Sequence, residues 1–417
     1  MVPPHLTSQL LVMKRTFSIG LLGLGSWATC SAANLYDVGT EADVAVPLKW
    51  SVGMNLIYDD NVAAGTVGPE EDSLALNPFV GLSFVSTTPQ TTWEVYGRLG
   101  LIYYFDEPAF GEDVYSQSRL GVNLTHNFNE RLRFTSRNFV SYELEPDYSY
   151  GYSSSRVLGE YLYWQTDNAL GYRWTERFGT YTGIRVGGTE YQDISNNDRF
   201  YYEPYVQGRY QLTPQSVVTL EYRYRSTEGS GISSDYTDHY ILGGVEHRFS
   251  PNTIGILRVG AQLHESDPGT DTTAPYMEFA LQSQINQQFR VKAFARYGIE
   301  VYDTVQFAPP ASFVEYDDRQ VFRLGFQSEY DISEKFAVQA GIDYIPSTFD
   351  GGRVISGPAV ATPELDETIF NGYVGVSLRF TDYLIGSLSY NYTNSSSDLV
   401  GRDYDRNRIS VGLTAEF

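Results

Sequence analysis

The feature that most constrains this chain is a two-residue alternation of apolar and polar side chains that returns in segment after segment. The last ten residues, RISVGLTAEF, show it clearly: Ile409, Val411, Leu413, Ala415 and Phe417 point to one side of an extended strand, and the intervening residues point to the other. Segments of roughly 10 to 15 residues with this pattern follow one another along most of the chain. The pattern predicts strands with one apolar and one polar face.

The gaps between these segments are alternately short and long. Eight short gaps lie at 87–90, 129–130, 175–177, 213–216, 250–253, 286–288, 333–335 and 381–382. Nine long gaps lie at 59–72, 106–113, 145–155, 192–199, 226–238, 265–273, 303–318, 346–367 and 393–405. Tight turns on one side and long loops on the other are typical of antiparallel barrels of the bacterial outer membrane. We therefore expect an all-β, closed transmembrane barrel of 18 strands, with 16 as the alternative.

The segment WEVYGRLGLIYYF at 93–105 tests the competing interpretation, a soluble β-sandwich. Its odd-numbered positions carry an apolar row that includes Trp93, Leu99 and Leu101, whereas its even-numbered positions include Glu94 and Arg98. A soluble sandwich would also alternate, but its outer face should be polar. An apolar exterior in lipid and a watery lumen explain both rows, and closure pairs every backbone group.

The start of the chain has the features of a secretory signal. Lys14 and Arg15 precede the apolar stretch TFSIGLLGLGSWA and small residues that end at Ala33. We expect a signal peptide at 1–33, with Met13 as an alternative true start, a short periplasmic segment at 34–48 and the barrel at 49–417. The single cysteine, Cys30, lies inside the signal, so the mature chain would have neither disulfide nor thiol chemistry.

The arginines and the aromatic residues agree with this assignment of faces. Fifteen arginines have inward parity, of which we take ten as candidate pore-lining residues: Arg98, Arg119, Arg133, Arg137, Arg185, Arg223, Arg258, Arg296, Arg323 and Arg408. Aromatic residues flank the short gaps at Trp93, Phe128, Trp174, Phe178, Phe249, Phe289, Phe336, Phe380 and Tyr383. They predict an aromatic girdle at the periplasmic interface.

Charge is distributed unevenly between the loops and the lumen. Removing the signal would take the formal net charge from −22 to −24, since Lys14 and Arg15 leave with it and no acid does. The nine long gaps contain 30 acidic residues and three arginines, Arg199, Arg353 and Arg402. Acidic loops fit solvation and cation bridging to lipopolysaccharide, and they exclude nucleic acid as a partner. Inward arginines outnumber inward acids, which favours a lumen that attracts anions.

No motif in the sequence indicates an enzyme, a cofactor site or a metal site. His239 and His264 end neighbouring segments, but parity places them on opposite faces, so they should not form a metal pair. Asp59, Asp60 and Asn61 have two interpretations. Clustered oxygen ligands suit Ca²⁺, and the same residues commonly end a strand and begin a turn, which is the simpler interpretation.

Two stretches resemble known outer-membrane proteins. A last strand that ends in a carboxy-terminal phenylalanine, here Phe417, is similar to the signal that the barrel assembly machinery reads in its clients. The stretches WSVGMNLIYDDNVAAG and EEDSLALNPFVGLSF resemble the beta-barrel porin 2 family, in which a similar Tyr-Asp-Asp-Asn stretch ends the first strand. The resemblance covers residues 50–417 and implies an outer-membrane barrel.

Three functions fit these observations. The leading hypothesis is a passive, porin-like channel for small polar solutes, anions among them, because barrels of this size generally enclose an aqueous channel. The second is an export barrel for an anionic exopolysaccharide, since an arginine-lined lumen resembles that of the alginate exporters. The third is a structural or adhesive surface barrel. The solute and the oligomeric state do not follow from the sequence.

Overall fold

The computed structural model describes residues 46–62, 64, 70–106, 108, 112–144, 160–192, 198–230, 234–267, 269, 271–300, 304–309, 311–398 and 401–417. The expected signal peptide at 1–33, most of the expected periplasmic segment and the gap at 145–155 lie outside these residues. The first strand begins at Val46, three residues before the expected start of the barrel.

Every regular element in the described part of the chain is a β-strand. The nineteen strands are β1 (Val46–Asp59), β2 (Ser73–Thr87), β3 (Thr91–Tyr104), β4 (Val114–Asn127), β5 (Leu132–Glu143), β6 (Tyr161–Arg173), β7 (Phe178–Tyr191), β8 (Arg199–Thr213), β9 (Ser216–Gly229), β10 (Asp235–Ser250), β11 (Thr253–Asp267), β12 (Thr272–Gln284), β13 (Phe289–Ile299), β14 (Val305–Ala308), β15 (Ser312–Asp331), β16 (Phe336–Ser356), β17 (Leu365–Arg379), β18 (Leu384–Ser397) and β19 (Tyr404–Glu416). These residues include no helix long and apolar enough to cross a membrane.

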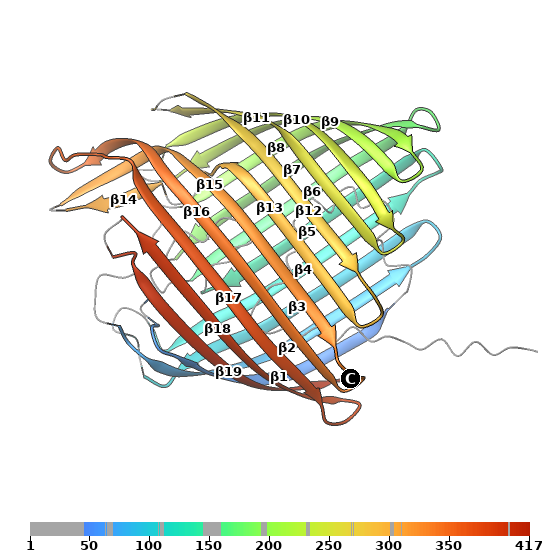
Figure 1. Ribbon diagram of the computed structural model, residues 1–417, viewed down its shortest axis with the longest axis horizontal. Coiled ribbons are helices and arrows are strands. Elements are labelled where there is room, and N and C mark those ends of the chain that lie inside the picture. The colour runs from blue at the N-terminus through green and yellow to red at the C-terminus, as the bar shows by residue number, and fades with distance from the viewer. Residues whose placement is uncertain are drawn as a thin grey trace, which may run out of the picture.

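Eighteen of the strands close into one antiparallel barrel (Figure 1). Each strand pairs with its neighbours in sequence, except that β13 pairs directly with β15, and β14 pairs only with the first residues of β15. The first and last strands, β1 and β19, pair from Ser51 with Glu416 to Asp59 with Arg408 and complete the ring. The expected closed barrel of 18 strands is confirmed.

The eight short gaps are confirmed as turns between neighbouring strands. Side chains within the turns accept hydrogen bonds from backbone amides and so fix the turn geometry. Asn129 Oδ1 accepts bonds from the amides of Arg131 and Leu132, at 2.8 and 2.9 Å. Thr175 Oγ1 accepts one from Phe178 at 3.0 Å. Short polar side chains that bond the backbone ahead of them favour such turns.

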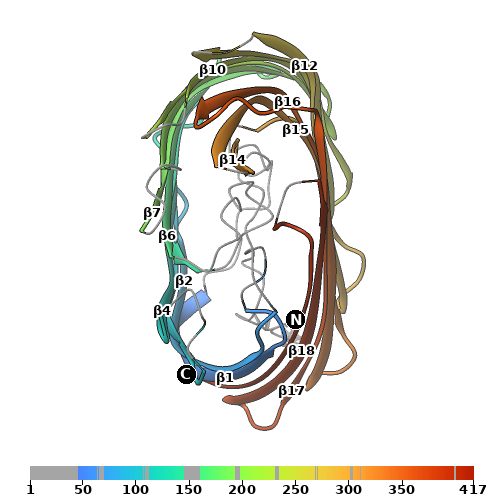
Figure 2. The same ribbon diagram turned by 90° about the vertical axis from the view of Figure 1, so that its left-hand side faces the viewer.

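The two longest gaps, 303–318 and 346–367, were predicted wrongly, because they are largely strand. The gaps at 226–238, 265–273 and 393–405 were predicted too long, since more than half of each also belongs to the flanking strands. β15 has 20 residues and β16 has 21, about twice the 9 to 11 that cross a membrane. The additional residues pair with each other and with β14, so their backbone groups are satisfied beyond the membrane. We call β14, residues 312–320 and residues 347–356 the mouth extension. Figure 2 shows β14 inside the ring of strands, so the extension bends over the barrel opening.

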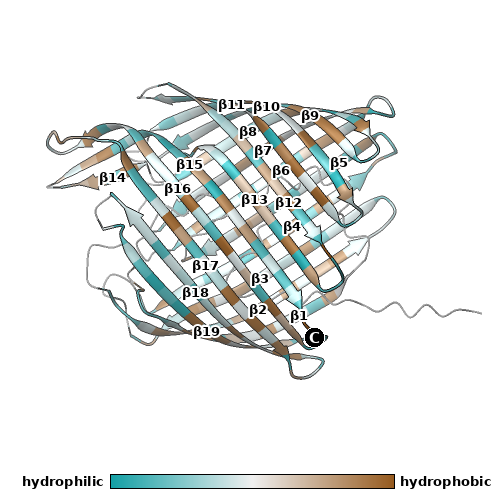
Figure 3. Ribbon diagram, in the orientation of Figure 1, coloured by the Kyte–Doolittle hydropathy of each residue, from teal (hydrophilic) through white to brown (hydrophobic). Residues whose placement is uncertain are grey.

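The outer face of the barrel is apolar. Leu99, Leu220 and Val411 are 55, 67 and 54% exposed, as expected for side chains that face lipid. Figure 3 shows hydrophobic residues recurring along most strands. Seven of the nine predicted girdle residues are exposed beside the short turns: Trp93, Phe128, Trp174, Phe178, Phe249, Phe380 and Tyr383. The predicted faces are therefore confirmed in these strands.

The inner face is packed by aromatic rings that lie over glycines of the neighbouring strand. Tyr96 is the cross-strand partner of Gly121, and an added Cβ at Gly121 would lie 2.1 Å from the tyrosine ring. Tyr373 covers Gly341 in the same way, with 2.4 Å between the added Cβ and the ring. Only glycine leaves room for these rings to lie flat on the wall.

Candidate functional site: the lumen and its extracellular mouth

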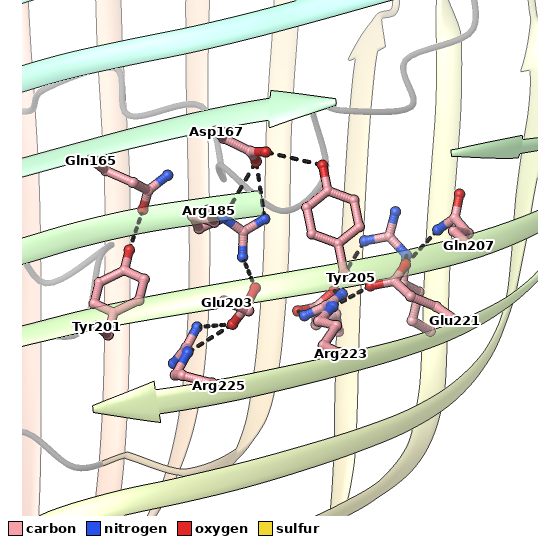
Figure 4. Close-up of polar contacts among 12 residues, drawn as sticks. Gln165, Asp167, Arg185, Tyr201, Glu203, Tyr205, Gln207, Glu221, Arg223 and Arg225 are labelled. Carbon is pink, nitrogen blue, oxygen red and sulfur yellow. Dashed lines mark hydrogen bonds and ion pairs between the residues drawn. The ribbon is translucent and has the colours of Figure 1, made fainter. Parts of the chain in front are cut away.

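Strands β6 to β9 carry a chain of buried ion pairs on their inner face (Figure 4). Arg185 of β7 contacts Asp167 of β6 at 3.2 Å and also pairs with Glu203 of β8. Arg225 of β9 reaches the other oxygen of Glu203 at 2.6 Å. Glu203 is fully buried and Asp167 is 2% exposed, so each carboxylate needs these partners.

The chain of ion pairs continues across β10 to β12. Arg223 and Arg258 both bind Glu278, at 2.9 and 3.0 Å, and Arg209 binds Glu246 at 2.5 Å. Together these groups form the ionic network, which has five acids and five arginines: Asp167, Glu203, Glu221, Glu246, Glu278, Arg185, Arg209, Arg223, Arg225 and Arg258. Its charges sum to zero. Three predicted pore-lining residues, Arg185, Arg223 and Arg258, therefore lie in a neutral wall.

Two further predicted residues share one carboxylate. Arg296 of β13 and Arg323 of β15 are direct cross-strand partners. This arrangement is unfavourable on its own, because like charges at opposed positions repel each other. Glu300 lies between them and pairs with both, at 2.7 Å to Arg323. Arg323 is only 1% exposed, whereas Arg296 is half-buried.

The remaining predicted arginines on the inner face of β3 to β5 form what we call the arginine wall: Arg98, Arg119, Arg133 and Arg137. All four are half-buried. Arg98 and Arg119 are direct cross-strand partners. The inner face of these three strands carries only two acids, Glu94 and Glu143. The arginine wall is therefore the part of these strands where positive charge is in excess.

Contacts from neighbouring strands orient the guanidinium groups of the arginine wall. The Nη2 of Arg98 donates to Asn77 Oδ1 at 2.9 Å, and its guanidinium carbon lies 3.8 Å from the ring centre of Phe79. Asn77 is itself fixed, because its Nδ2 donates to the backbone oxygen of Leu101 at 2.7 Å. Arg119 lies over the ring of Phe139 at 5.1 Å. Stacking on aromatic rings and directed hydrogen bonds suit guanidinium groups.

The Asp59-Asp60-Asn61 stretch closes the seam between β1 and β19. Arg406 binds both oxygens of Asp59, at 3.0 and 2.5 Å, and both residues are buried. Asp60 accepts hydrogen bonds from the backbone and side chain of Asn407, at 2.6 and 2.7 Å. Asn61 donates to a backbone oxygen of the last strand at 2.9 Å. These oxygens bind protein groups, so the stretch joins the two ends of the barrel.

The last two predicted site residues, Arg408 and Phe417, also lie at the seam between β1 and β19. Arg408 is half-buried on the inner face of β19 and is the cross-strand partner of Asp59. Phe417 pairs its backbone with Trp50 through bonds of 3.1 and 2.8 Å, and its side chain is 72% exposed. Arg406 is not among the arginines predicted from the sequence. Its inward parity, two residues before Arg408, is the signal that identifies it.

The three arginines of the acidic gaps hold the mouth together. Glu315 of the mouth extension is fully buried and binds Arg353 at 2.8 Å, Ser234 Oγ at 2.6 Å and the hydroxyl of Tyr236 at 3.1 Å. Arg199 stacks on Tyr236 at 5.3 Å and donates to the backbone oxygen of Ser234 at 3.3 Å. The extension is thereby fixed to the ends of β8 and β10.

A second buried glutamate anchors the other side of the mouth. Glu367 lies 3.6 Å from Arg319 and 3.4 Å from Arg402, and is 1% exposed. Val314, Tyr316 and Phe349 form a small apolar core within the extension. The extension is thus a folded part of the mouth with its own buried contacts.

The histidines lie where parity placed them. His239 faces outward and bonds the hydroxyl of Tyr222 at 2.8 Å, whereas His264 is 1% exposed on the inner side and bonds Asp238 at 2.8 Å. The two rings therefore point away from each other across the sheet. Within the described residues, no group of three or more potential metal ligands is present.

The barrel is that of a multi-pass protein of the outer membrane of a Gram-negative bacterium. Its strands form a closed ring without free edges, and its outer face combines an apolar belt with aromatic residues at the short turns. Barrels of this kind satisfy every backbone group within the hydrocarbon and expose the side chains that lipid favours.

Comparison with protein-family models finds no match to this chain, so the resemblance to the beta-barrel porin 2 family is not confirmed. Comparison with curated proteins also finds no match. Solved structures with a similar outline include OccAB3 of Acinetobacter baumannii, with 11% identity over 89% of this chain and 99% of that chain and a TM-score of 0.45. The outer membrane protein OpdK of Pseudomonas aeruginosa has 8% identity over 89 and 99%, with a TM-score of 0.44. The siderophore receptor PirA of A. baumannii has 7% identity over 90 and 81%, with a TM-score of 0.43.

Proposed function

We propose that this protein is a porin-like channel for the passive diffusion of small polar solutes, with a mild preference for anions. The observation that supports the preference is the uneven charge of the inner wall. The ionic network on β6 to β12 is neutral, whereas the inner face of β3 to β5 carries the four arginines of the arginine wall and only two glutamates. An anion in the lumen is attracted chiefly by the arginine wall.

The surroundings of the arginine wall strengthen its attraction. Aromatic rings such as Phe79 and Phe139 lie beside the guanidinium groups and provide walls of low dielectric constant. Buried acids of the long gaps, such as Glu315 and Glu367, are paired with arginines, and exposed ones, such as Glu112 and Asp235, are screened within about 10 Å at 0.1 M salt. The arginine wall should therefore determine ion preference at 0.1 M salt and above.

Current through the purified barrel in a planar lipid bilayer tests this proposal. Under a tenfold KCl gradient, perfect anion selectivity gives a reversal potential of about 59 mV, and we expect a fraction of that value with the sign of chloride preference. Arg98→Gln and Arg119→Gln should each move the potential toward that of potassium preference. Arg177→Gln, at an exposed periplasmic turn, is the matched control and should leave the potential unchanged.

Two results would reject the proposal in different ways. A barrel that is correctly folded and inserted but passes no current is not a passive channel. A wild-type channel that prefers potassium at every salt concentration would show that the arginine wall does not decide which ions pass.

A further inference from the structure

A cluster of ionisable side chains lies where the mouth extension meets the barrel. Its centre is His264, whose Nδ1 lies 2.8 Å from Asp238 Oδ1 and whose ring stacks on Tyr236 at 5.1 Å. Gln262 donates to the same oxygen of Asp238 at 2.8 Å. All of these groups belong to β10 and β11, so they form the barrel side of the cluster.

The extension supplies the other side of the cluster with carboxylates. Asp317 and Asp318 of β15 are 6 and 8% exposed. Thr272 of β12 donates to Asp318 Oδ2 at 2.6 Å, whereas Asp318 Oδ1 is buried and has no hydrogen bond among the described residues. Asp350 of β16 is the cross-strand partner of Asp318. Like charges at directly opposed positions destabilise a sheet. Seating adds this pair to the cluster that already holds Asp238, so protons that reduce the negative charge of the cluster stabilise the seated extension.

His264 lies outside the membrane-spanning part of its strand. A strand crosses in about 9 to 11 residues, so β11, which starts at the periplasmic turn with Thr253, has crossed by about residue 263. Ionisation here therefore responds to the external pH. Asp238, Asp317 and Asp318 act on the ring, and Asp350 is opposite Asp318. Two arginines adjoin the cluster: Arg225 is the cross-strand partner of Asp238, and Arg199 lies over the ring of Tyr236.

Both kinds of group in the cluster hold protons more tightly than usual. Burial alone would lower the pKa of His264, but the hydrogen bond and charge of Asp238, together with Asp318, raise it above 6.5. Burial raises the pKa of Asp318 above 3.8, and the charges of Asp317 and Asp350 add to this rise, although the hydrogen bond from Thr272 and the charge of His264 act against it. The seated state therefore binds more protons than a released state in which these groups are solvated.

We propose that this cluster is a proton-dependent latch that seats the mouth extension at acidic pH and releases it as the external pH rises. The sign follows from linkage: a group whose pKa is raised in the seated state stabilises that state at low pH and loses the effect as pH rises through the raised value. For His264 the loss begins above about pH 6.5. The inference rests on the proposed channel function, because the extension lies across the opening of the barrel.

Bilayer current measured from pH 5 to pH 9 tests the latch. The ratio of open to seated channels should rise with pH, by at most about tenfold per pH unit for each proton released. His264→Gln removes the imidazole that titrates and should flatten this dependence. Asp318→Asn removes a charge that raises the pKa of His264, so it should displace the dependence to lower pH. His239→Gln is the matched control, since its ring faces outward on β10, and it should retain the wild-type profile.

Hydrogen exchange in lipid vesicles provides a readout that does not need current. The measured quantity is the ratio of the exchange rate at residues 312–320 in the wild type to that in His264→Gln at the same pH, so that intrinsic rates cancel. This ratio should change between pH 6 and pH 9. A constant ratio, or a pH profile of current that survives in His264→Gln and is not displaced in Asp318→Asn, would overturn the latch. Absence of current at every pH with a changing exchange ratio would reject the channel function and leave the latch standing.

Discussion

Removing Asp59 should destabilise the barrel more than removing any single exposed charge. Asp59 is 2% exposed and receives three hydrogen bonds from Arg406, while Arg408 is its direct partner across the seam. Asp59→Ala leaves two arginines on the same face of β19 without this carboxylate. Breaking a buried pair in this way costs about 3 to 5 kcal/mol.

Replacing the arginine of this ion pair should lower the free energy of unfolding by less than replacing the aspartate. Arg406→Met removes one guanidinium group but leaves Arg408 beside Asp59, so we expect a loss near the lower end, about 3 kcal/mol. Glu416→Ala is the matched control on the same strand. Its pair with Arg379 is 3.6 Å long and part-exposed, so the loss should stay within about 1 kcal/mol.

Urea unfolding of the barrel in lipid vesicles, followed by tryptophan fluorescence and by mobility on unheated gels, measures these differences. The free energies are comparable only if the slope against urea concentration is the same for each variant. Equal stability of Asp59→Ala and Glu416→Ala would show that the seam is held by its backbone ladder alone.

Two further predictions concern the faces of the barrel and its assembly. Leu388→Arg should impair insertion by about 2 to 4 kcal/mol, because Leu388 is 49% exposed on the outer face. Ser389→Arg, on the inner face beside Gly375 and Ser410, should insert almost normally. Similar insertion of the two variants would contradict the register of β18. We also expect deletion of Phe417, or Phe417→Asp, to lower the amount of folded barrel in the outer membrane without blocking export to the periplasm, and normal assembly of both variants would disprove the assembly signal.

The sequence predicts most of the barrel because the alternation of apolar and polar residues within each strand identifies its outer and inner faces. Alternation alone is sufficient to place Leu99 in lipid and Arg98 in the lumen, and the short turns follow from residues such as Asn129. The mouth extension could not be predicted in this way. Its residues pair with each other outside the lipid, where no apolar face is required, so the alternation fades although the strand continues.

The pairing of the charged residues in the lumen could not be predicted from the sequence either. Parity shows that Arg185 and Glu203 face inward, but only the register across strands shows that they touch. The same register makes neighbours of Arg98 and Arg119, which are 21 positions apart in the chain. Counting inward charges reveals the excess of arginine without revealing on which strands it lies.

The neutral ionic network affects how the electric field is distributed across the lumen. Opposite charges no more than 3.8 Å apart act at a distance as dipoles, whose field decays faster than that of a single charge. The arginine wall, with its excess charge, projects further until salt screens it. The electrical axis of the lumen is therefore displaced from its geometric axis toward β3 to β5. In the proposed channel, an anion that follows the field would travel beside one wall of the barrel.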